Sequence, residues 1–249
     1  MPGSLKVELI APTLAVIIPV LNEAAHLPAL LSSLADDADE IIVVDGSSVD
    51  QTPAVARSFG CRVALTEPGR GRQLAAGARL ASSDLLLFLH ADCVPQPGAL
   101  NAIRSAFDDP AFIAGGMVQH IDSQKRVYRW IERAANVRVK RRGMIYGDSG
   151  LVVRRSAYTA AGGFAELPIF EDVEFCRRLT GLGRVGLIDG AGLRISARRW
   201  EREGLVACTA RNWLLTGAFL FGLEPHRLAR HYKAEQSSVL FHGKQSARH

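Results

Sequence analysis

The first part of the chain contains four short apolar runs. They are Leu14–Val20, Glu40–Val44, Cys61–Leu65 and Asp84–Leu89, and they are rich in aliphatic and β-branched side chains. Runs of this length and composition are typical of strands that are buried on both faces of a sheet. The sequence therefore predicts four strands here.

Amphipathic segments separate these runs. Leu27, Leu30, Leu31 and Leu34 recur at helical spacing within residues 22–37, and residues 50–59 and 72–80 have similar patterns. Asn22 is the predicted N-cap of the first of these helices. Strands that alternate with helices indicate βαβ units and a mostly parallel sheet flanked by helices, an α/β fold.

The second half of the chain has a less regular pattern. It predicts strands at Gly115–His120 and Arg184–Ile188, and a loop that leads into a strand at Gly147–Arg154. Helices are predicted at Tyr128–Lys140, Val173–Thr180, Cys208–Phe221 and Pro225–Tyr232. We expect a single domain over residues 1–232, divided into a first half (13–110), a second half (111–205) and C-terminal helices (206–232). Residues 233–249 form a polar tail, predicted to be disordered.

Composition narrows the class of protein. The chain has 249 residues, enough to bury a core without disulfides, and a net charge of +5 that suits an anionic ligand or surface better than nucleic acid. Its four cysteines form no CxxC pair, so we expect buried free thiols. With no secretory pattern and no apolar run of spanning length, we expect a cytoplasmic protein, with a peripheral position at the inner membrane surface as an alternative.

Polar clusters follow three of the predicted strands. Asn22-Glu23 follows the first, Asp45 ends the second, and His90-Ala91-Asp92 follows the fourth. Because ligands of parallel sheets bind beyond the carboxyl ends of the strands, these clusters predict one shared site. Each has a structural alternative: Asp45 as an acceptor in a turn, His90 as a packing histidine, and Asp92 as a turn cap.

Further groups could complete this site. Asp92 and His90 are competent ligands for Mn²⁺, and oxygen ligands suit Mg²⁺. Glu171 and Asp172 open a predicted helix, where acids either balance the helix dipole or supply a general base.

Arginines supply counter-charge to an anionic ligand. Arg70 and Arg72 precede a predicted helix, and Arg198-Arg199-Trp200 combines two guanidinium groups with an aromatic ring. The structural alternative is that these arginines are solvent-exposed surface charges. The GRGRQL segment lacks the third glycine of a dinucleotide fingerprint, which we therefore reject.

The ordered motifs resemble those of the family 2 glycosyltransferases, which have the GT-A fold, a nucleotide-diphospho-sugar transferase fold. The resemblance covers residues 15–230 and lies in IPVLNE (18–23), VVDGSS (43–48), FLHAD (88–92), GGF (162–164) and FED (170–172). Finer details, in YGD (146–148), SARRW (196–200) and Asn212-Trp213, resemble a bacterial branch associated with arsenosugar biosynthesis.

This resemblance implies an inverting, metal-assisted transfer from a nucleotide-diphosphate sugar, usually a UDP-sugar. Residues 13–110 would form the nucleotide-sugar-binding half and residues 111–205 the acceptor and catalytic half. Asp172 would be the catalytic base. The nucleotide would lie against Pro19, Asn22, Glu23, Asp45 and Arg72, the metal, Mn²⁺ or Mg²⁺, on Asp92 and His90, and the diphosphate and acceptor against Glu171, Arg198, Arg199 and Trp200. His90 replaces the first acid of the family's metal motif, and the glutamine of the QxxRW signature of processive members is absent.

Two other functions stay open. A sugar-phosphate nucleotidyltransferase shares the sheet but carries a glycine-rich, lysine-containing loop where this chain has Leu21-Asn22-Glu23. A non-catalytic nucleotide-sugar-binding domain is the second. The acceptor is unspecified, either a small molecule or lipid-linked.

The predicted C-terminal helices raise a separate question. They place Trp213, Leu214, Phe219 and Phe221 near Arg211, Arg227, Arg230 and Lys233. Packing against the domain, contact with an anionic membrane and a homodimer contact are the alternatives.

Overall fold

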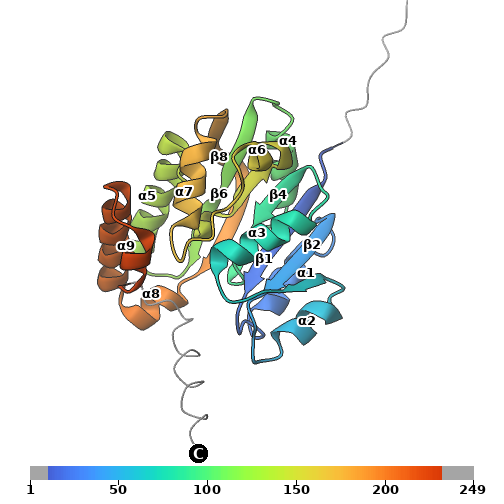
Figure 1. Cartoon of the computed structure of the whole chain (residues 1–249), viewed down its shortest axis with the longest axis horizontal. Coiled ribbons are helices and arrows are strands. Elements are labelled where there is room, and N and C mark those ends of the chain that lie inside the picture. The colour runs from blue at the N-terminus through green and yellow to red at the C-terminus, as the bar shows by residue number, and fades with distance from the viewer. Residues whose placement is uncertain (1–10, 232–249) are drawn as a thin grey trace, which may run out of the picture.

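The computed structural model describes residues 11–231 and contains one mixed sheet of eight strands in the order β3-β2-β1-β4-β7-β6-β8-β5 (Figure 1). The strands are β1 (Leu14–Val20), β2 (Glu40–Asp45), β3 (Arg62–Leu65), β4 (Leu85–Phe88), β5 (Cys93–Pro95), β6 (Phe112–Asp122), β7 (Leu151–Arg154) and β8 (Arg184–Ser196). This is the α/β architecture predicted from the sequence. The predicted tail, residues 233–249, lies outside the described residues.

Helices cover both faces of the sheet. They are α1 (Leu27–Leu34), α2 (Thr52–Ser58), α3 (Arg70–Leu80), α4 (Ala99–Ala106), α5 (Val127–Arg142), α6 (Arg155–Ala160), α7 (Glu171–Leu179), α8 (Arg198–Glu203), α9 (Leu205–Leu220) and α10 (Pro225–Ala229), with a 3₁₀ turn at Gly147–Ser149. Apolar side chains of α1, α2 and α4 pack on one face, and those of α3, α6 and α7 pack on the other. The sheet is therefore buried on both sides, as continuous apolar strands require.

The first half of the sheet is wholly parallel. β2 and β4 both flank β1, and the register pairs Val20 at the end of β1 with Asp45 at the end of β2. The carboxyl ends of β1, β2 and β4 therefore meet at one edge. Gly77 of α3 makes the close helix-to-sheet approach possible, because a Cβ there would lie 2.4 Å from Ile17 Cγ2.

The second half differs from its prediction. β7 pairs antiparallel with both β4 and β6, and β8 runs on to Ser196, eight residues beyond the predicted strand. The short elements β5, α4, α6 and α8 were not predicted. A register shift between Met117 and Val118 lets β8 continue beside β6 past Gly190, and such an irregularity leaves little trace in an apolar pattern.

The cysteines match the predicted free thiols. Cys93, Cys176 and Cys208 are buried and Cys61 is half-buried, and all four are unpaired. Burial raises the pKa of the Cys176 thiol to about 12, so this thiol stays protonated and unreactive.

Helices that could cross a membrane are not found in residues 11–231.

Candidate active site

The loop after β1 is held by the loop after β2. Asn22 adopts a left-handed conformation with φ 56°, its backbone N–H donates to Ser48 Oγ at 2.9 Å, and its Oδ1 accepts from Val49 N at 2.9 Å. The predicted N-cap role of Asn22 is wrong, since α1 begins at Leu27 with His26 as its N-cap. The short side chain of Asn22 instead ties two strand-end loops together, and asparagine is among the few residues that adopt this conformation readily.

Asp45 is buried at the end of β2, and its carboxylate forms hydrogen bonds within its own loop. Its Oδ2 accepts the backbone N–H of Ser48 at 3.0 Å, and its Oδ1 accepts the Ser48 hydroxyl. This is the turn geometry of the structural alternative. Asp45 therefore fixes the shape of the loop that lies against Asn22.

Glu23 and Asp92 meet at one arginine. Arg198, at the start of α8, donates from Nη2 to Glu23 Oε1 at 2.9 Å, and its Nε lies 3.2 Å from Asp92 Oδ2. The three side chains are 29%, 14% and 23% exposed. Residues that are far apart in the sequence thus form one partly buried ionic cluster, in which Arg198 balances two carboxylates.

A second ionic cluster begins α7. Arg70 Nε contacts Glu171 Oε1 at 2.5 Å, and its Nη2 lies 3.6 Å from Asp172 Oδ2. Asp172 Oδ2 also accepts the backbone N–H of Gly147 at 2.6 Å. Burial raises the pKa of Glu171, which is 1% exposed, whereas Arg70 opposes the rise. The two acids therefore occupy different environments despite being adjacent.

Phe170 fixes the backbone just before these acids. It has a positive φ of 64°, which is uncommon for a bulky residue, and its ring stacks on Phe219 of α9 with centroids 5.0 Å apart. Such conformations persist only where surrounding contacts hold them, and they gather at functional sites. The stack thus ties α9 to the residues that carry Glu171 and Asp172.

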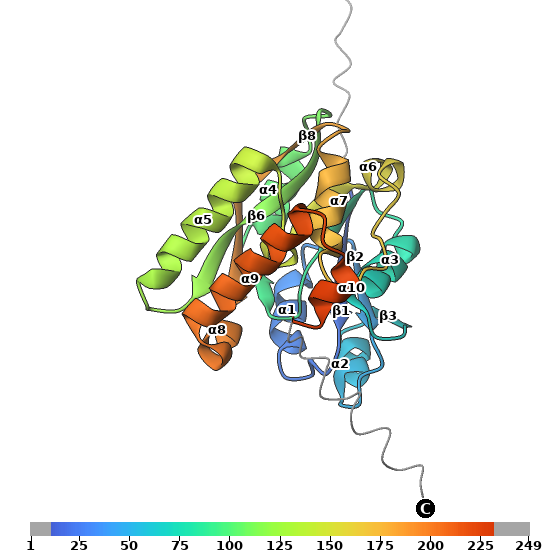
Figure 2. The same ribbon diagram turned by 60° about the vertical axis from the view of Figure 1, so that its left-hand side comes forward.

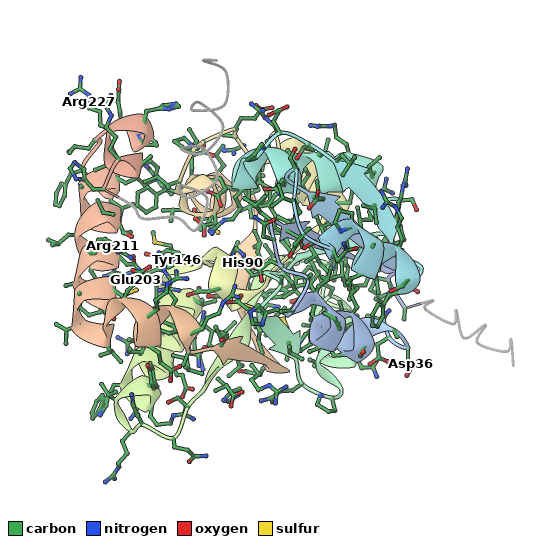
Figure 3. The ribbon with its side chains drawn as sticks, turned by 90° about the horizontal axis from the view of Figure 1, so that it is seen from below. Asp36, His90, Tyr146, Glu203, Arg211 and Arg227 are labelled. Carbon is green, nitrogen blue, oxygen red and sulfur yellow. The ribbon has the colours of Figure 1, made fainter. Side chains whose placement is uncertain are left out.

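His90, labelled in Figure 3, lies near Arg70 and Asp172, because all three side chains surround the position of a Cβ added at Gly147. Burial lowers the pKa of its imidazole well below the usual value, and the guanidinium groups of Arg70, Arg199 and Arg198 lower it further. The ring is therefore neutral at physiological pH. Pro19, Arg70, His90, Gly147, Glu171 and Asp172 all line one small pocket.

Arg72 and Trp200 lie apart from the two clusters, whereas Arg199 acts electrostatically on His90 and also contacts Glu203. Arg72 is exposed and its Nε lies 3.2 Å from Glu166 Oε2. Arg199 Nε lies 3.7 Å from Glu203 Oε1, and the Trp200 ring packs edge-on against Tyr128 with centroids 5.8 Å apart. Trp200 thus presents its ring to an apolar cluster beneath α8. Arg70, which the sequence offered together with Arg72 as a counter-charge, and Gly147 of the YGD segment take the positions near the acids.

The side chains of His90, Arg70 and Asp172 converge on Gly147. We expect Gly147→Ala to lower kcat/KM by about tenfold or more, because displacing groups near the reacting atoms by about 1 Å is costly. An added Cβ would lie 2.6 Å from His90 Nε2, 3.1 Å from Arg70 Nη2 and 3.4 Å from Asp172 Oδ2. Gly181→Ala is the control, because its nearest neighbour would be 3.7 Å away. Steady-state kinetics and melting curves of both variants check this, and equal activity of the two would contradict it.

The comparison with protein families decides the classification. The family model described as glycosyl transferase family 2 matches residues 15–164, more than half of the chain. The chain belongs to glycosyl transferase family 2. The matched span includes the loops after β1, β2 and β4 and the turn at Gly147, whereas α7 and α8 lie beyond it.

Several curated relatives of this glycosyltransferase come from mycobacteria. The pre-mycofactocin glycosyltransferase of Mycobacterium tuberculosis is 29% identical over 236 residues, which cover 87% of this chain and 47% of the relative. The chain thus spans about half the length of that relative. The uncharacterized glycosyltransferase Rv0539 of M. tuberculosis is 27% identical, over 68% of this chain and 88% of the relative.

Solved structures share the fold. The mannosyltransferase PcManGT from Pyrobaculum calidifontis, in complex with GDP-Man and Mn²⁺, has a TM-score of 0.63 at 21% identity, covering 87% of this chain and 67% of that one. S. aureus TarS in complex with UDP has a TM-score of 0.63 at 19% identity, covering 74% and 60%. M. tuberculosis glucosyl-3-phosphoglycerate synthase with Mn²⁺ and UDP-glucose has 0.54 at 20%, covering 74% and 70%. At these identities the likeness establishes the GT-A-like fold.

Proposed function

We propose that this glycosyltransferase moves a sugar from a nucleotide-diphosphate donor, a UDP-sugar, to an acceptor hydroxyl with inversion at the anomeric carbon. The observation that carries the proposal is the convergence of two ionic clusters at the carboxyl edge of β1 and β4. One joins Glu23 and Asp92 through Arg198, and the other holds Asp172 at the start of α7.

The donor would lie across this edge. Pro19, Asn22 and the Asp45 loop would contain the nucleoside, with Asp45 shaping the loop as well as facing the base. Arg198 and Arg70 would meet the diphosphate, because guanidinium groups bind phosphate oxygens in pairs. Fold neighbours were solved with UDP, UDP-glucose and GDP-Man, and the resemblance at Asp45 favours uracil.

A divalent cation, Mn²⁺ or Mg²⁺, fits this site only together with the donor. Among residues 11–231 no group of three or more His, Cys, Asp or Glu side chains could hold one alone. Mg²⁺ is commonly bound by one or two carboxylates and substrate phosphates, which suits Asp92. The cation would offset charge on the departing diphosphate. His90 is surrounded by three arginines, so we assign the metal to Asp92 before His90.

The proposed reaction is a single displacement. The acceptor oxygen attacks the anomeric carbon, the bond from that carbon to the phosphate oxygen breaks, and the nucleoside diphosphate leaves with the electron pair. Asp172 accepts the hydroxyl proton, and its bond from Gly147 N holds the carboxylate in place. Base catalysis of this kind contributes about 10²–10⁴-fold.

The acceptor is the least constrained part. Glu171, Arg199 and Trp200 would border it, although Trp200 packs against Tyr128. The acceptor hydroxyl would belong either to a small molecule or to a lipid-linked molecule. A cytoplasmic location and a homodimer stay predictions as well.

A panel of nucleotide sugars tests the donor assignment. We expect UDP-sugars to raise the melting temperature of the protein in the presence of Mn²⁺ more than in its absence, because a ligand of the folded state stabilises it. Asp92→Ala should remove the Mn²⁺-dependent part of the shift and keep the rest. A shift in Asp92→Ala that still depends on Mn²⁺ would reject this metal site.

The same panel separates the rival functions. Release of pyrophosphate from a nucleoside triphosphate and a sugar-1-phosphate would indicate a nucleotidyltransferase. Donor binding without any hydrolysis or transfer under Mn²⁺ would indicate a binding domain.

A further inference from the structure

The outer face of α9 is apolar along its whole length. Four apolar side chains are largely exposed: Val206 (77%), Trp213 (70%), Leu214 (74%) and Phe221 (91%), the last of which directly follows the helix. Their spacing of seven and eight residues places them on one stripe of the helix. An exposed apolar stripe of this size marks a surface for interaction.

The fold does not need this stripe. The inner side of α9 already packs on the body through Leu215 and Phe219, which are buried. Arg211, the one charged residue in the sequence of α9, also lies on the inner side, with Nη2 2.5 Å from Glu203 Oε2 (Figure 3). Packing therefore places the charge inside and leaves the apolar side chains in solvent.

The helix α5, which runs beside α9, carries exposed cations. α5 and α9 run side by side in Figure 1 and Figure 2, and α5 exposes Trp130 at 73%. The helix α5 contains one acid, the buried Glu132, and five exposed cations: Arg129, Arg133, Lys140, Arg141 and Arg142. A surface hollow of about 300 Å³ between α5 and the sheet is lined in part by Arg129, Arg133 and Lys140. Arg227 of α10 points away from the body (Figure 3).

We propose that α9, with α5 beside it, docks on the surface of an anionic lipid bilayer. The stripe of α9 enters the interface between headgroups and acyl chains, and the cations of α5 meet the lipid phosphates. Apolar and aromatic side chains next to arginines and lysines are typical of helices that lie in a membrane interface. Each cation near an anionic membrane adds to the attraction.

A second copy of the chain fits this surface less well. A two-fold contact places the same patch on both subunits, so it would bring the cations of α5 close to those of the other copy. Like charges at an interface oppose association, whereas an anionic bilayer offers the opposite charge. Charge complementarity therefore favours the bilayer.

Docking would also bring the bilayer close to the proposed base. Phe219 of α9 stacks on Phe170, which directly precedes Glu171 and Asp172. The docking itself does not depend on the proposed function, and its test uses no activity.

Vesicle sedimentation tests the docking with the full-length protein. Phosphatidylcholine vesicles are compared with vesicles of equal parts phosphatidylcholine and phosphatidylglycerol, at low and high salt. We expect binding to the anionic vesicles that weakens with salt, as screening requires. In the triple variant Trp213→Gln, Leu214→Gln, Phe221→Gln, the vesicle affinity should fall by about tenfold or more because apolar burial is lost.

Leu65→Gln is the matched control, since Leu65 is an apolar side chain of β3 that is 66% exposed. It should bind like the parent protein. Equal binding to both kinds of vesicle, or to neither, overturns the proposal. A dimer in analytical ultracentrifugation that the triple variant dissociates also overturns it, because the stripe would then join two copies.

Discussion

Asp172→Asn is expected to lower kcat by about 10²–10⁴-fold while the Kd for the donor nucleotide changes little. The amide cannot accept the acceptor's proton, but it has nearly the same shape. Its oxygen can still accept the Gly147 N–H that Asp172 Oδ2 accepts at 2.6 Å. Donor contacts proposed for Arg198 and the Asp45 loop are left intact. Transfer assays with saturating acceptor, together with calorimetric titration of UDP, measure the two quantities separately.

Glu171→Gln is the control for this variant. Glu171 is adjacent and fully buried, and it is bound to Arg70 Nε. Removing its charge should lower the melting temperature, because a buried ion pair loses one partner, while kcat falls less than in Asp172→Asn. If Asp172→Asn loses nucleotide binding in proportion to its rate, Asp172 supports the structure instead of taking the proton.

The parallel half of the fold could be predicted from the sequence because its strands are continuous and apolar. Leu14–Val20 is buried at every position, and a pattern that continuous has few other interpretations. The loops at the strand ends followed from the same alternation. The sequence therefore located the edge of the sheet at which Glu23 and Asp92 meet.

The second half was harder because its elements depend on tertiary contacts. The strand β5 has three residues and exists through its pairing with β8. The helix α8 has six residues and is fixed in part by Arg198 reaching Glu23. Isolated helices of this length are not stable, so local propensity could not reveal them.

The site residues, too, could be predicted from the sequence only in part. Position in a motif pointed to Asp92 and Asp172, but the sequence analysis assigned Arg72, and not Arg70, to the nucleotide. The two arginines are separated by one residue at the start of α3, which turns their side chains about 200° apart around the helix axis. Arg70 consequently reaches Glu171, whereas Arg72 reaches the exposed Glu166. Choosing between them required the exact start of the helix.

Arg198→Ala should raise the affinity for Mn²⁺ and lower the rate of sugar transfer. Arg198 lies against Asp92 Oδ2 at 3.2 Å, the carboxylate to which we assign the metal, and it also neutralises Glu23 at 2.9 Å. Without the guanidinium group, two partly buried carboxylates lose their shared counter-charge and attract a cation more strongly. The Kd for Mn²⁺, titrated in the presence of saturating UDP, should therefore fall by about tenfold or more.

The kcat for sugar transfer should fall by about 10²-fold in the same variant, because the guanidinium group that would donate charged hydrogen bonds to the leaving diphosphate is lost. Arg198→Lys should lie between, since lysine keeps the charge but not the two-pronged geometry. Arg72→Ala is the control: Arg72 is exposed and pairs with Glu166, so both quantities should stay near those of the parent. Calorimetric titration of Mn²⁺ and steady-state kinetics give the two values. If metal affinity and turnover both fall in Arg198→Ala, then Arg198 organises the loop around Glu23 instead of holding the place of a cation at Asp92.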